Sequence, residues 1–260
     1  MAVAVPDILA KIVSHKRATL ARVEADRPGL ERRAANRTSA RDFRAALKAN
    51  PPAIISEIKK ASPSRGVLTG DFRPASIAQM YASGGAAALS VLTDEEFFQG
   101  SLADLEAARA AVTIPVLRKD FTIDGLHVIE AAAHGADAIL LIAAILNVAQ
   151  MRSFRILAAR YEMAALVEVH DDLDLEAALE SGAEIVGVNN RNLHTFEVRL
   201  DTSLRLVEKM PAGIVKVAES GIDSREDVHT LRAAGFHAFL VGEHLMKSPD
   251  PAAALRDLRS

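Results

Sequence analysis

The sequence predicts an α/β fold, a single (β/α)8 TIM barrel with an N-terminal helical extension. The chain has 260 residues, and a barrel of this type needs about 250. Eight short apolar runs are separated by segments of helix length, as expected for parallel βα units. Similar segments also recur at a period near 50 residues, so that four quarters of two βα units each account for the chain.

The first 50 residues are predicted to be helical. Apolar residues recur there at helical spacing in two segments, namely Ile8, Leu9, Ile12 and Val13, and then Phe43, Ala46 and Leu47. Pro51 and Pro52 end the helical stretch, because proline lacks an amide hydrogen and restricts the residue before it. We therefore divide the chain into an extension, 1–50, packed on the barrel, and the barrel itself, 51–260, which together form one domain.

Eight apolar runs of strand length follow the two prolines. They are Ile54–Ile58, Ala87–Leu92, Ile114–Leu117, Ala138–Ile142, Ala164–Val169, Ile185–Val188, Ile214–Val217 and Ala238–Val241. Short apolar runs that alternate with amphipathic segments are typical of parallel strands buried on both faces. Each run is therefore expected to form one strand of the barrel.

The repeat is carried by four glycine-led segments that resemble one another. They begin at Gly85, Gly135, Gly182 and Gly235, at intervals of 50, 47 and 53 residues. Each glycine follows a helical segment and precedes a strand, where a left-handed C-cap is needed. A propeller has a similar period but lacks long helical segments rich in Ala, Leu and Glu. A doubly wound open sheet is the main structural alternative, and its usual glycine-rich turn after the first strand is absent.

Composition narrows the class of protein. Apolar residues make up 50% of the chain, charged residues 25%, and the net charge is −3, which gives no reason to expect nucleic acid or an anionic membrane as partner. The absence of cysteine excludes disulfides, thiolate nucleophiles and cysteine-ligated metals. The longest apolar stretch, 138–146, is far shorter than the ~18 residues of a spanning helix. Because the N-terminus also lacks a secretory signal, we expect a cytoplasmic protein.

Polar residues stand at the carboxyl ends of five of the predicted strands. They are Glu57, Lys59, Lys119, Glu168, Asn189, Arg191 and Glu219. They share parity with apolar residues earlier in the same strands, so the apolar side chains fill the barrel while the polar ones converge on its mouth. One such residue alone is more often a salt bridge or a solvated strand end. Seven in phase indicate a functional site, and carboxylates beside lysines and an arginine suit proton transfer on an anionic substrate.

Two glycines near the end of the chain add a class of ligand. Gly221 follows the run Ile214–Val217, and Gly242 follows Ala238–Val241. The loops at these places in a barrel often bind phosphate with a short helix N-terminus. Either glycine alone could simply cap a tight turn, but the pair on adjacent strands predicts a phosphate site. The eight histidines are scattered, without the spacing of metal ligands.

Six segments, taken in order, resemble the signatures of the indole-3-glycerol-phosphate synthase family. They are Ile55–Gly66, Leu92–Asp94 with Phe97–Ser101, Leu117–Phe121, Leu166–His170, Gly187–Leu193 and Ala218–Ile222. The resemblance runs over residues 1–260 and includes the extension. It implies ring closure, decarboxylation and dehydration of 1-(o-carboxyphenylamino)-1-deoxyribulose 5-phosphate, giving indole-3-glycerol phosphate in tryptophan biosynthesis. It further implies no cofactor and no metal, a small-molecule substrate as the only partner, and a monomer.

The resemblance also implies roles for individual residues. Lys119 corresponds to the general acid that protonates the substrate carbonyl, and Glu168 to its proton-handling partner in the dehydration. Lys59 corresponds to the residue that binds the substrate carboxylate, and is a second candidate acid. Glu57 and Asn189 correspond to residues that hold the substrate and the two lysines in place.

The remaining site residues implied by the resemblance fall into three sets. The polar set is Glu219, Arg191 and Ser220. The phosphate set is Ser64, Gly221, Gly242 and Glu243. The apolar wall around the anthranilate ring is Phe98, Phe121, Leu140 and Leu193.

Several finer expectations accompany these roles. A general acid such as Lys119 needs a pKa near neutrality, which a lysine crowded by cations or partly desolvated can approach. We expect residues 62–71 to form a mobile lid, and His170 to lie in a loop beyond its strand. His244 is expected on the surface of a helix, and Arg118, with outward parity, on the surface or behind the site.

Three other functions stay open at this point. Another sugar-phosphate barrel, such as phosphoribosylanthranilate isomerase, would use the same phosphate loops, although such isomerases lack the long extension. A Schiff-base aldolase would use Lys119 as nucleophile, and borohydride trapping would reveal it. A barrel that only binds a ligand or a partner enzyme would show no turnover. The lack of cysteine also permits an engineered sequence, but nothing at the matched positions indicates a redesigned activity.

Overall fold

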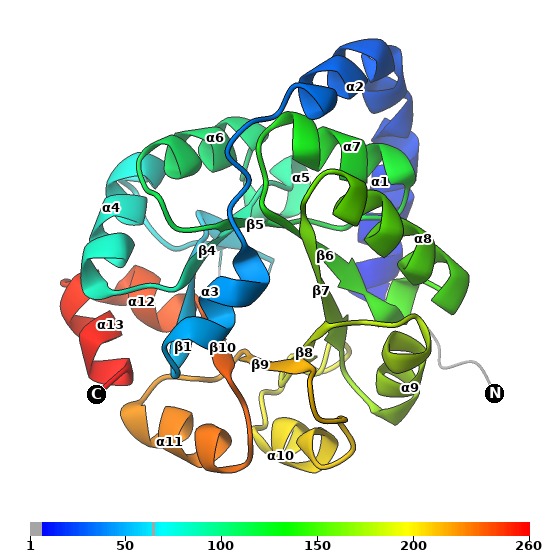
Figure 1. Ribbon diagram of the computed structural model, residues 1–260. Coiled ribbons are helices and arrows are strands. Elements are labelled where there is room, and N and C mark those ends of the chain that lie inside the picture. Colours follow the sequence, from blue (N-terminus) through cyan, green and yellow to red (C-terminus); the bar gives the residue numbers. More distant parts are fainter. Residues whose placement is uncertain (1–6, 64–65) are drawn as a thin grey trace.

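The computed structural model describes residues 7–63 and 66–260, and eight parallel strands in it close into a barrel (Figure 1). Around the barrel the order is β1-β10-β9-β8-β7-β6-β5-β4. The strands are β1 Ala53–Ile58, β4 Ala88–Leu92, β5 Val116–Lys119, β6 Ala138–Ile142, β7 Ala164–Val169, β8 Ile185–Asn189, β9 Val215–Glu219 and β10 Ala238–Val241. The predicted TIM barrel is confirmed, and each predicted apolar run overlaps one of these strands.

A ring of helices covers the outside of the barrel (Figure 1). These are α4 Pro74–Gly84, α6 Leu102–Ala110, α7 Gly125–Ala133, α8 Val148–Arg160, α9 Asp172–Glu180, α10 Asp201–Val207, α11 Arg225–Ala233 and α13 Pro251–Leu258, with the short α5 Glu95–Phe98, η1 Ala143–Ile145 and α12 Glu243–Lys247 in loops. Short polar side chains begin several of them, since Ser101, Asp124, Asn147, Asp171 and Ser224 each accept a hydrogen bond from a first-turn amide.

The four glycines of the repeat behave as predicted. Gly85, Gly135, Gly182 and Gly235 have φ angles of 93°, 85°, 82° and 110°. This left-handed backbone reverses the chain between each helix and the strand that follows, and glycine adopts it without a Cβ clash.

Three helices precede the first strand, and the apolar spacing predicts the first and the third of them. They are α1 Asp7–Ala25, α2 Arg27–Ala35 and α3 Phe43–Ala49. Helices α1 and α2 pack against α7 on the outside of the barrel. Helix α3 contacts β1, β4 and β9, and buries Phe43 and Leu47 against the side chains that fill the barrel. In the described part of the chain no helix is long and apolar enough to cross a membrane.

The barrel interior is filled by alternate residues of its strands. Ile55, Leu117, Leu166 and Val217 belong to this inner cluster, so the parity prediction is confirmed for the apolar half of the pattern. The strand register then places two polar strand ends side by side, since Asn189 at the end of β8 pairs with Glu219 at the end of β9. A second, outer cluster lies between strands and helices.

A feature that the sequence did not predict follows β1. Ala61–Ser62 and Gly66–Val67 form β2 and β3, a two-stranded antiparallel pair. Neither is long enough to show an apolar alternation. Apart from Ala61, the pair falls in the predicted lid, 62–71, of which residues 64 and 65 are outside the described part. The expectation for Ser64 therefore lies outside the described residues as well.

Candidate active site

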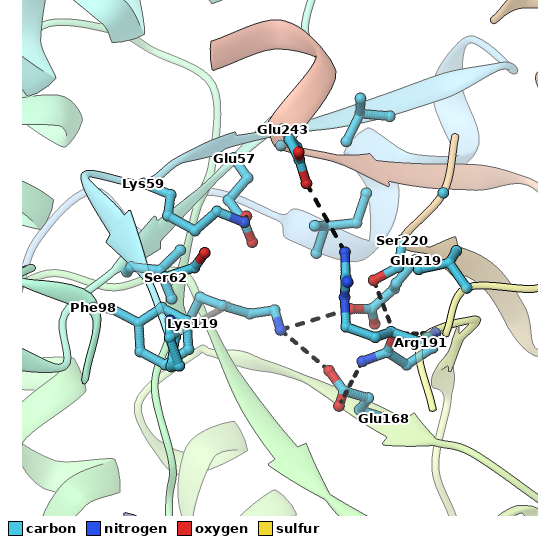
Figure 2. Close-up of a pocket in the computed structure, with 18 of the residues that line it drawn as sticks. Glu57, Lys59, Ser62, Phe98, Lys119, Glu168, Arg191, Glu219, Ser220 and Glu243 are labelled. Carbon is cyan, nitrogen blue, oxygen red and sulfur yellow. Dashed lines mark hydrogen bonds and ion pairs between the residues drawn. The ribbon is translucent and has the colours of Figure 1, made fainter. Parts of the chain in front are cut away.

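One cavity of about 1060 Å³ opens at the carboxyl ends of the barrel strands. All the predicted site residues that the structure describes line it, namely Glu57, Lys59, Phe98, Lys119, Phe121, Leu140, Glu168, Asn189, Arg191, Leu193, Glu219, Ser220, Gly221, Gly242 and Glu243. The side chains at the polar strand ends therefore meet around one space (Figure 2).

Lys119 lies between two carboxylates at the floor of this cavity. It is the last residue of β5, two positions after the buried Leu117. Its Nζ lies 3.1 Å from Glu168 Oε2 and 3.7 Å from Glu219 Oε2, and Figure 2 shows the lysine directed toward both. The ammonium group is thus placed where it can exchange a proton with either side chain or with a bound molecule.

The groups nearest to Lys119 are carboxylates, whereas cationic neighbours were expected. Burial alone would lower the pKa of the lysine, but Glu168, Glu219 and Glu57 together outweigh burial and raise it above its ordinary value. The expected near-neutral pKa of Lys119 is therefore wrong. The reason is that the other lysine, Lys59, is paired with Glu57 at 2.5 Å and leaves carboxylates as the nearest charges.

Glu168 accepts contacts on both carboxylate oxygens. Lys119 lies at Oε2, and the side-chain amide of Asn189 donates to Oε1 at 3.2 Å. His170 Nε2 also lies 3.3 Å from Oε1. Burial would raise the pKa of Glu168, but Lys119 and then His170 and Asn189 bring it well below the usual range. The carboxylate is therefore ionised at neutral pH.

Glu219, unlike Glu168, has a raised pKa. It is 2% exposed, and its Oε1 has no hydrogen-bond partner among the described residues. Burial, together with the negative charges of Glu168 and Glu57, raises its pKa to about 8 against the opposing effect of Lys119. A Cβ at Gly187 would collide with Oε1, so the glycine in β8 provides the space for this carboxyl group. Two neighbouring acids with pKa values pushed apart can serve as donor and acceptor.

Asn189 is fixed by the loops that follow β8 and β9. Its Oδ1 accepts hydrogen bonds from Ser220 Oγ at 2.9 Å and from the Arg191 amide at 3.0 Å. This orientation leaves the Nδ2 group to donate to Glu168. The Arg191 guanidinium lies 4.0 Å from Glu243 across the cavity (Figure 2).

The loops after β9 and β10 form a turn and a short helix start at one side of the cavity. Ser220 and Gly221 both have left-handed backbone, with φ angles of 67° and 72°. Gly242 precedes α12 directly. Free amides at such turns and helix starts suit an anion. His244, expected on the surface, is half-buried and lines the cavity.

An apolar wall faces the charged groups. The rings of Phe98 and Phe121 lie 6.0 Å apart, centroid to centroid, with their planes at 35°. The first helix also reaches this wall, because Ile8, Leu9 and Ile12 line the cavity. The resemblance implies that the extension packs near the site, and the structure shows which residues of its first helix reach the cavity.

Two charged residues outside the cavity contact side chains of the site. Arg118 is 6% exposed and contacts Asp120 at 3.1 Å and Glu130 at 2.7 Å, so it lies behind the site and not on the surface. His170 lies in the bend just after β7, as expected for a loop residue, yet it contacts Glu168. Its parity with Glu168 was the signal that could have identified it.

Comparison with known proteins shows which protein family this chain is similar to. A family model described as indole-3-glycerol phosphate synthase matches residues 9–258. The indole-3-glycerol phosphate synthase of Polaromonas naphthalenivorans (strain CJ2) is 52% identical over 258 residues, which cover 97% of this chain and 98% of the relative. The protein of the same name from Chromobacterium violaceum is 50% identical and covers 97% of both chains.

Solved structures with lower sequence identity share the architecture. Thiamine phosphate pyrophosphorylase from Pyrococcus furiosus superposes with a TM-score of 0.61 at 16% identity, covering 81% of this chain and 95% of that one. KGPDC from Streptococcus mutans gives a TM-score of 0.60 at 16% identity, covering 80% and 95%. At this level of identity the likeness concerns the barrel fold alone.

Proposed function

The chain belongs to the indole-3-glycerol phosphate synthase family, and from this premise we propose which residues carry out the reaction. The enzyme is a decarboxylating lyase of tryptophan biosynthesis, which converts 1-(o-carboxyphenylamino)-1-deoxyribulose 5-phosphate to indole-3-glycerol phosphate. The observation that carries the proposal is the position of Lys119 between Glu168 and Glu219. An acid next to an ionised base is what ring closure followed by dehydration requires.

Lys119 is the general acid for ring closure. When the aromatic carbon attacks the ribulose carbonyl, the carbonyl oxygen gains negative charge and must be protonated. The raised pKa of Lys119 means that the lysine carries its proton at neutral pH. Glu219, with a pKa of about 8, is itself largely protonated there. A neutral Glu219 leaves less negative charge around the ammonium group, which makes the lysine a stronger acid than it would be between two carboxylates.

Glu168 handles the proton in the dehydration. Loss of water needs one group to protonate the departing hydroxyl and another to accept a proton from the ring-closed intermediate. Glu168 is ionised and lies 3.1 Å from Lys119, so the two can act as this acceptor and donor. Asn189 and Glu57 hold the carboxylate and the second lysine in place, through the contacts from Asn189 to Glu168 and from Glu57 to Lys59.

The two anionic groups of the substrate bind at different places. Lys59 pairs with the anthranilate carboxylate before it leaves as carbon dioxide, and remains a second candidate acid. The phosphate binds at Gly221 and Gly242, whose loops offer backbone amides. Ser64 and Glu243 complete the phosphate set, and Arg191 and Ser220 are further residues that bind the substrate. The ring packs in the apolar wall of Phe98, Phe121, Leu140 and Leu193.

The organisation of the protein belongs to the proposal too. We propose that residues 1–50 and 51–260 form one domain in which the extension packs on the barrel, and that the enzyme is a cytoplasmic monomer that binds neither nucleic acid nor membrane. A net charge of −3 and the absence of a spanning helix in the described residues support the part of this proposal that concerns nucleic acid and membranes.

Fluorescence-monitored turnover of the anilino-ribulose phosphate tests the central assignment, because indole-3-glycerol phosphate fluoresces strongly. Lys119→Ala should lose about 10²–10⁴-fold in kcat, the range for a general acid, with an unchanged circular dichroism spectrum. Normal turnover by this variant would refute the role of Lys119. Treatment of the parent with borohydride and substrate separates acid catalysis from an aldolase mechanism, since only a Schiff base would be trapped on Lys119.

A further inference from the structure

His170 lies against the proposed base without lining the cavity. The alternation of side chains at the end of β7 places residues 168 and 170 on the same side. His170 Nε2 lies 3.3 Å from Glu168 Oε1, and its side chain is 15% exposed. At this distance the two groups form an ion pair when the ring is protonated, and Nε2 makes no aligned hydrogen bond with the described residues. Among the described residues the cavity lining includes Glu168 but not His170, so the histidine acts on the site only through the carboxylate.

The other side of the ring is held by Asp174, in the first turn of α9. Asp174 Oδ2 lies 3.3 Å from His170 Nδ1 and accepts the backbone amide of His170 at 3.0 Å. Asp174 is itself tied to the helix start, because its amide donates to Asp171 Oδ1 at 2.9 Å. One carboxylate therefore fixes both the bend and the orientation of the imidazole.

Each ring nitrogen of His170 thus faces a carboxylate. A neutral imidazole donates from one nitrogen only and would turn a lone pair toward the other carboxylate, whereas an imidazolium donates from both. The titratable groups around the ring are Glu168 and Asp174, with Glu219 farther away. Burial would lower the pKa of His170, but Asp174 and then Glu168 raise it to about 9. The histidine is therefore a buried cation beside the base.

We propose that His170, oriented by Asp174, is a positioning residue for Glu168, whose Oε1 it holds so that Oε2 faces Lys119 and the carboxylate stays ionised. This inference rests on the proposed role of Glu168 as proton acceptor. Asn189 also donates to Oε1, but it is uncharged and fixes the orientation of the carboxylate without supplying a positive charge. His170 supplies that charge, and its contribution therefore depends on pH.

Asp174→Asn tests the positive charge on His170 and preserves the chain bend at that residue. The amide oxygen of Asn can still accept the backbone hydrogen bond, but it no longer stabilises a proton on His170. The pKa of the histidine then falls from about 9 toward its ordinary value of about 6.5. The imidazolium is present below its pKa and lost as pH rises. The kcat of Asp174→Asn should therefore begin to fall about one pH unit lower than that of the parent, whose own basic limb follows Glu219 near 8.

His170→Gln tests the other limb of the profile. Glutamine removes the positive charge, so the pKa of Glu168 rises from its depressed value. A base acts only when ionised, and the acidic limb of kcat should therefore move up by about one pH unit or more, a tenfold loss per unit on that limb. His134→Gln is the matched control, because His134 pairs with Glu106 at 2.8 Å on the outer helices. The control should keep the parent profile.

Two outcomes would overturn the inference. Profiles of both variants that superimpose on the parent would show that His170 does not influence Glu168. A loss by the same factor at every pH would show a purely structural role. Failure of the proposed function would look different, since Glu168→Gln would then retain the parent rate whatever the histidine variants do.

Discussion

The carboxylate of Glu57 occupies the space into which a side chain at position 242 would project. A Cβ built on Gly242 would collide with Glu57 Oε1 and would lie 3.1 Å from its Cβ. The first and last strands of the barrel thus meet at the site. Glu57 packs against the loop that is proposed to bind phosphate. The glycine is needed here for space, and its φ of −122° is open to other residues.

Gly242→Ala should therefore impair catalysis more than folding. The carboxylate of Glu57 would have to move, and Lys59, which it holds at 2.5 Å, would move with it. A displacement near 1 Å in an active site costs up to about a hundredfold in rate, so we expect kcat/KM to fall roughly tenfold to a hundredfold. Steady-state kinetics and thermal unfolding measure the two effects separately.

Gly125→Ala is the matched control for that variant. A Cβ there would lie 3.4 Å from Leu157, an ordinary van der Waals contact. Parent activity in Gly125→Ala together with parent activity in Gly242→Ala would show that Glu57 adjusts freely and that the packing of these two residues has no catalytic consequence.

Glu219→Gln should change the pH profile more than the rate near neutrality. With a raised pKa of about 8, Glu219 is protonated below that pH and ionises as the pH rises through it. Ionisation places a second full negative charge beside Lys119 and weakens the acid. Glutamine mimics the protonated form, so the variant should keep kcat within about tenfold of the parent at pH 6.5 and lose the decline near pH 8. An unaltered basic limb in the variant would assign that limb to another group.

The sequence predicted those site residues whose positions follow from the alternation of side chains along a strand. Glu57, Lys119 and Glu168 were identified because a period of two places each of them in line with an inward aliphatic residue. The charge state of Lys119 was not predicted. It depends on which carboxylates lie within a few ångströms of the lysine, and the register of the barrel strands decides which ones do. Likewise, the contact of His170 with Asp174 depends on how α9 begins, which a strand pattern does not describe.

The same limit applies to the extension. Its apolar spacing predicted helices, but only the packed structure places Lys16 against the site. Lys16 Nζ lies 2.6 Å from Asp120 Oδ1 and 3.0 Å from Asp94 Oδ2, both in loops at the carboxyl ends of strands. Burial opposes the charge on Asp120, but Arg118 and then Lys16 hold its pKa well below the usual range.

Lys16→Met should therefore loosen α1 over the cavity. The helix contributes Ile8, Leu9 and Ile12 to the cavity wall, so we expect KM for the substrate to rise about tenfold, the loss of roughly 1.4 kcal/mol of binding, with a smaller change in kcat. Lys11→Met, at an exposed position of the same helix, serves as control. Equal KM values for the two variants would contradict a role for the ion pairs of Lys16.

Asp137 offers a prediction about stability, far from the chemistry. Its side chain is fully buried before β6 and accepts hydrogen bonds from the backbone amides of Arg41 and Val116 and from the guanidinium of Arg109. It thereby ties the extension to the amino-terminal side of the barrel. Asp137→Ala would leave the two backbone amides without this acceptor, and would leave the buried guanidinium of Arg37, 3.4 Å from Asp137 Oδ1, without its counter-charge. Removing one member of a buried ion pair costs about 3–5 kcal/mol, so chemical denaturation should show a loss of that size.

Asp71→Ala removes a carboxylate from an exposed pair with Arg73 and should change stability by less than about 1 kcal/mol. A similar small change for Asp137→Ala would mean that water replaces the lost acceptor and that the extension is held by apolar contacts alone.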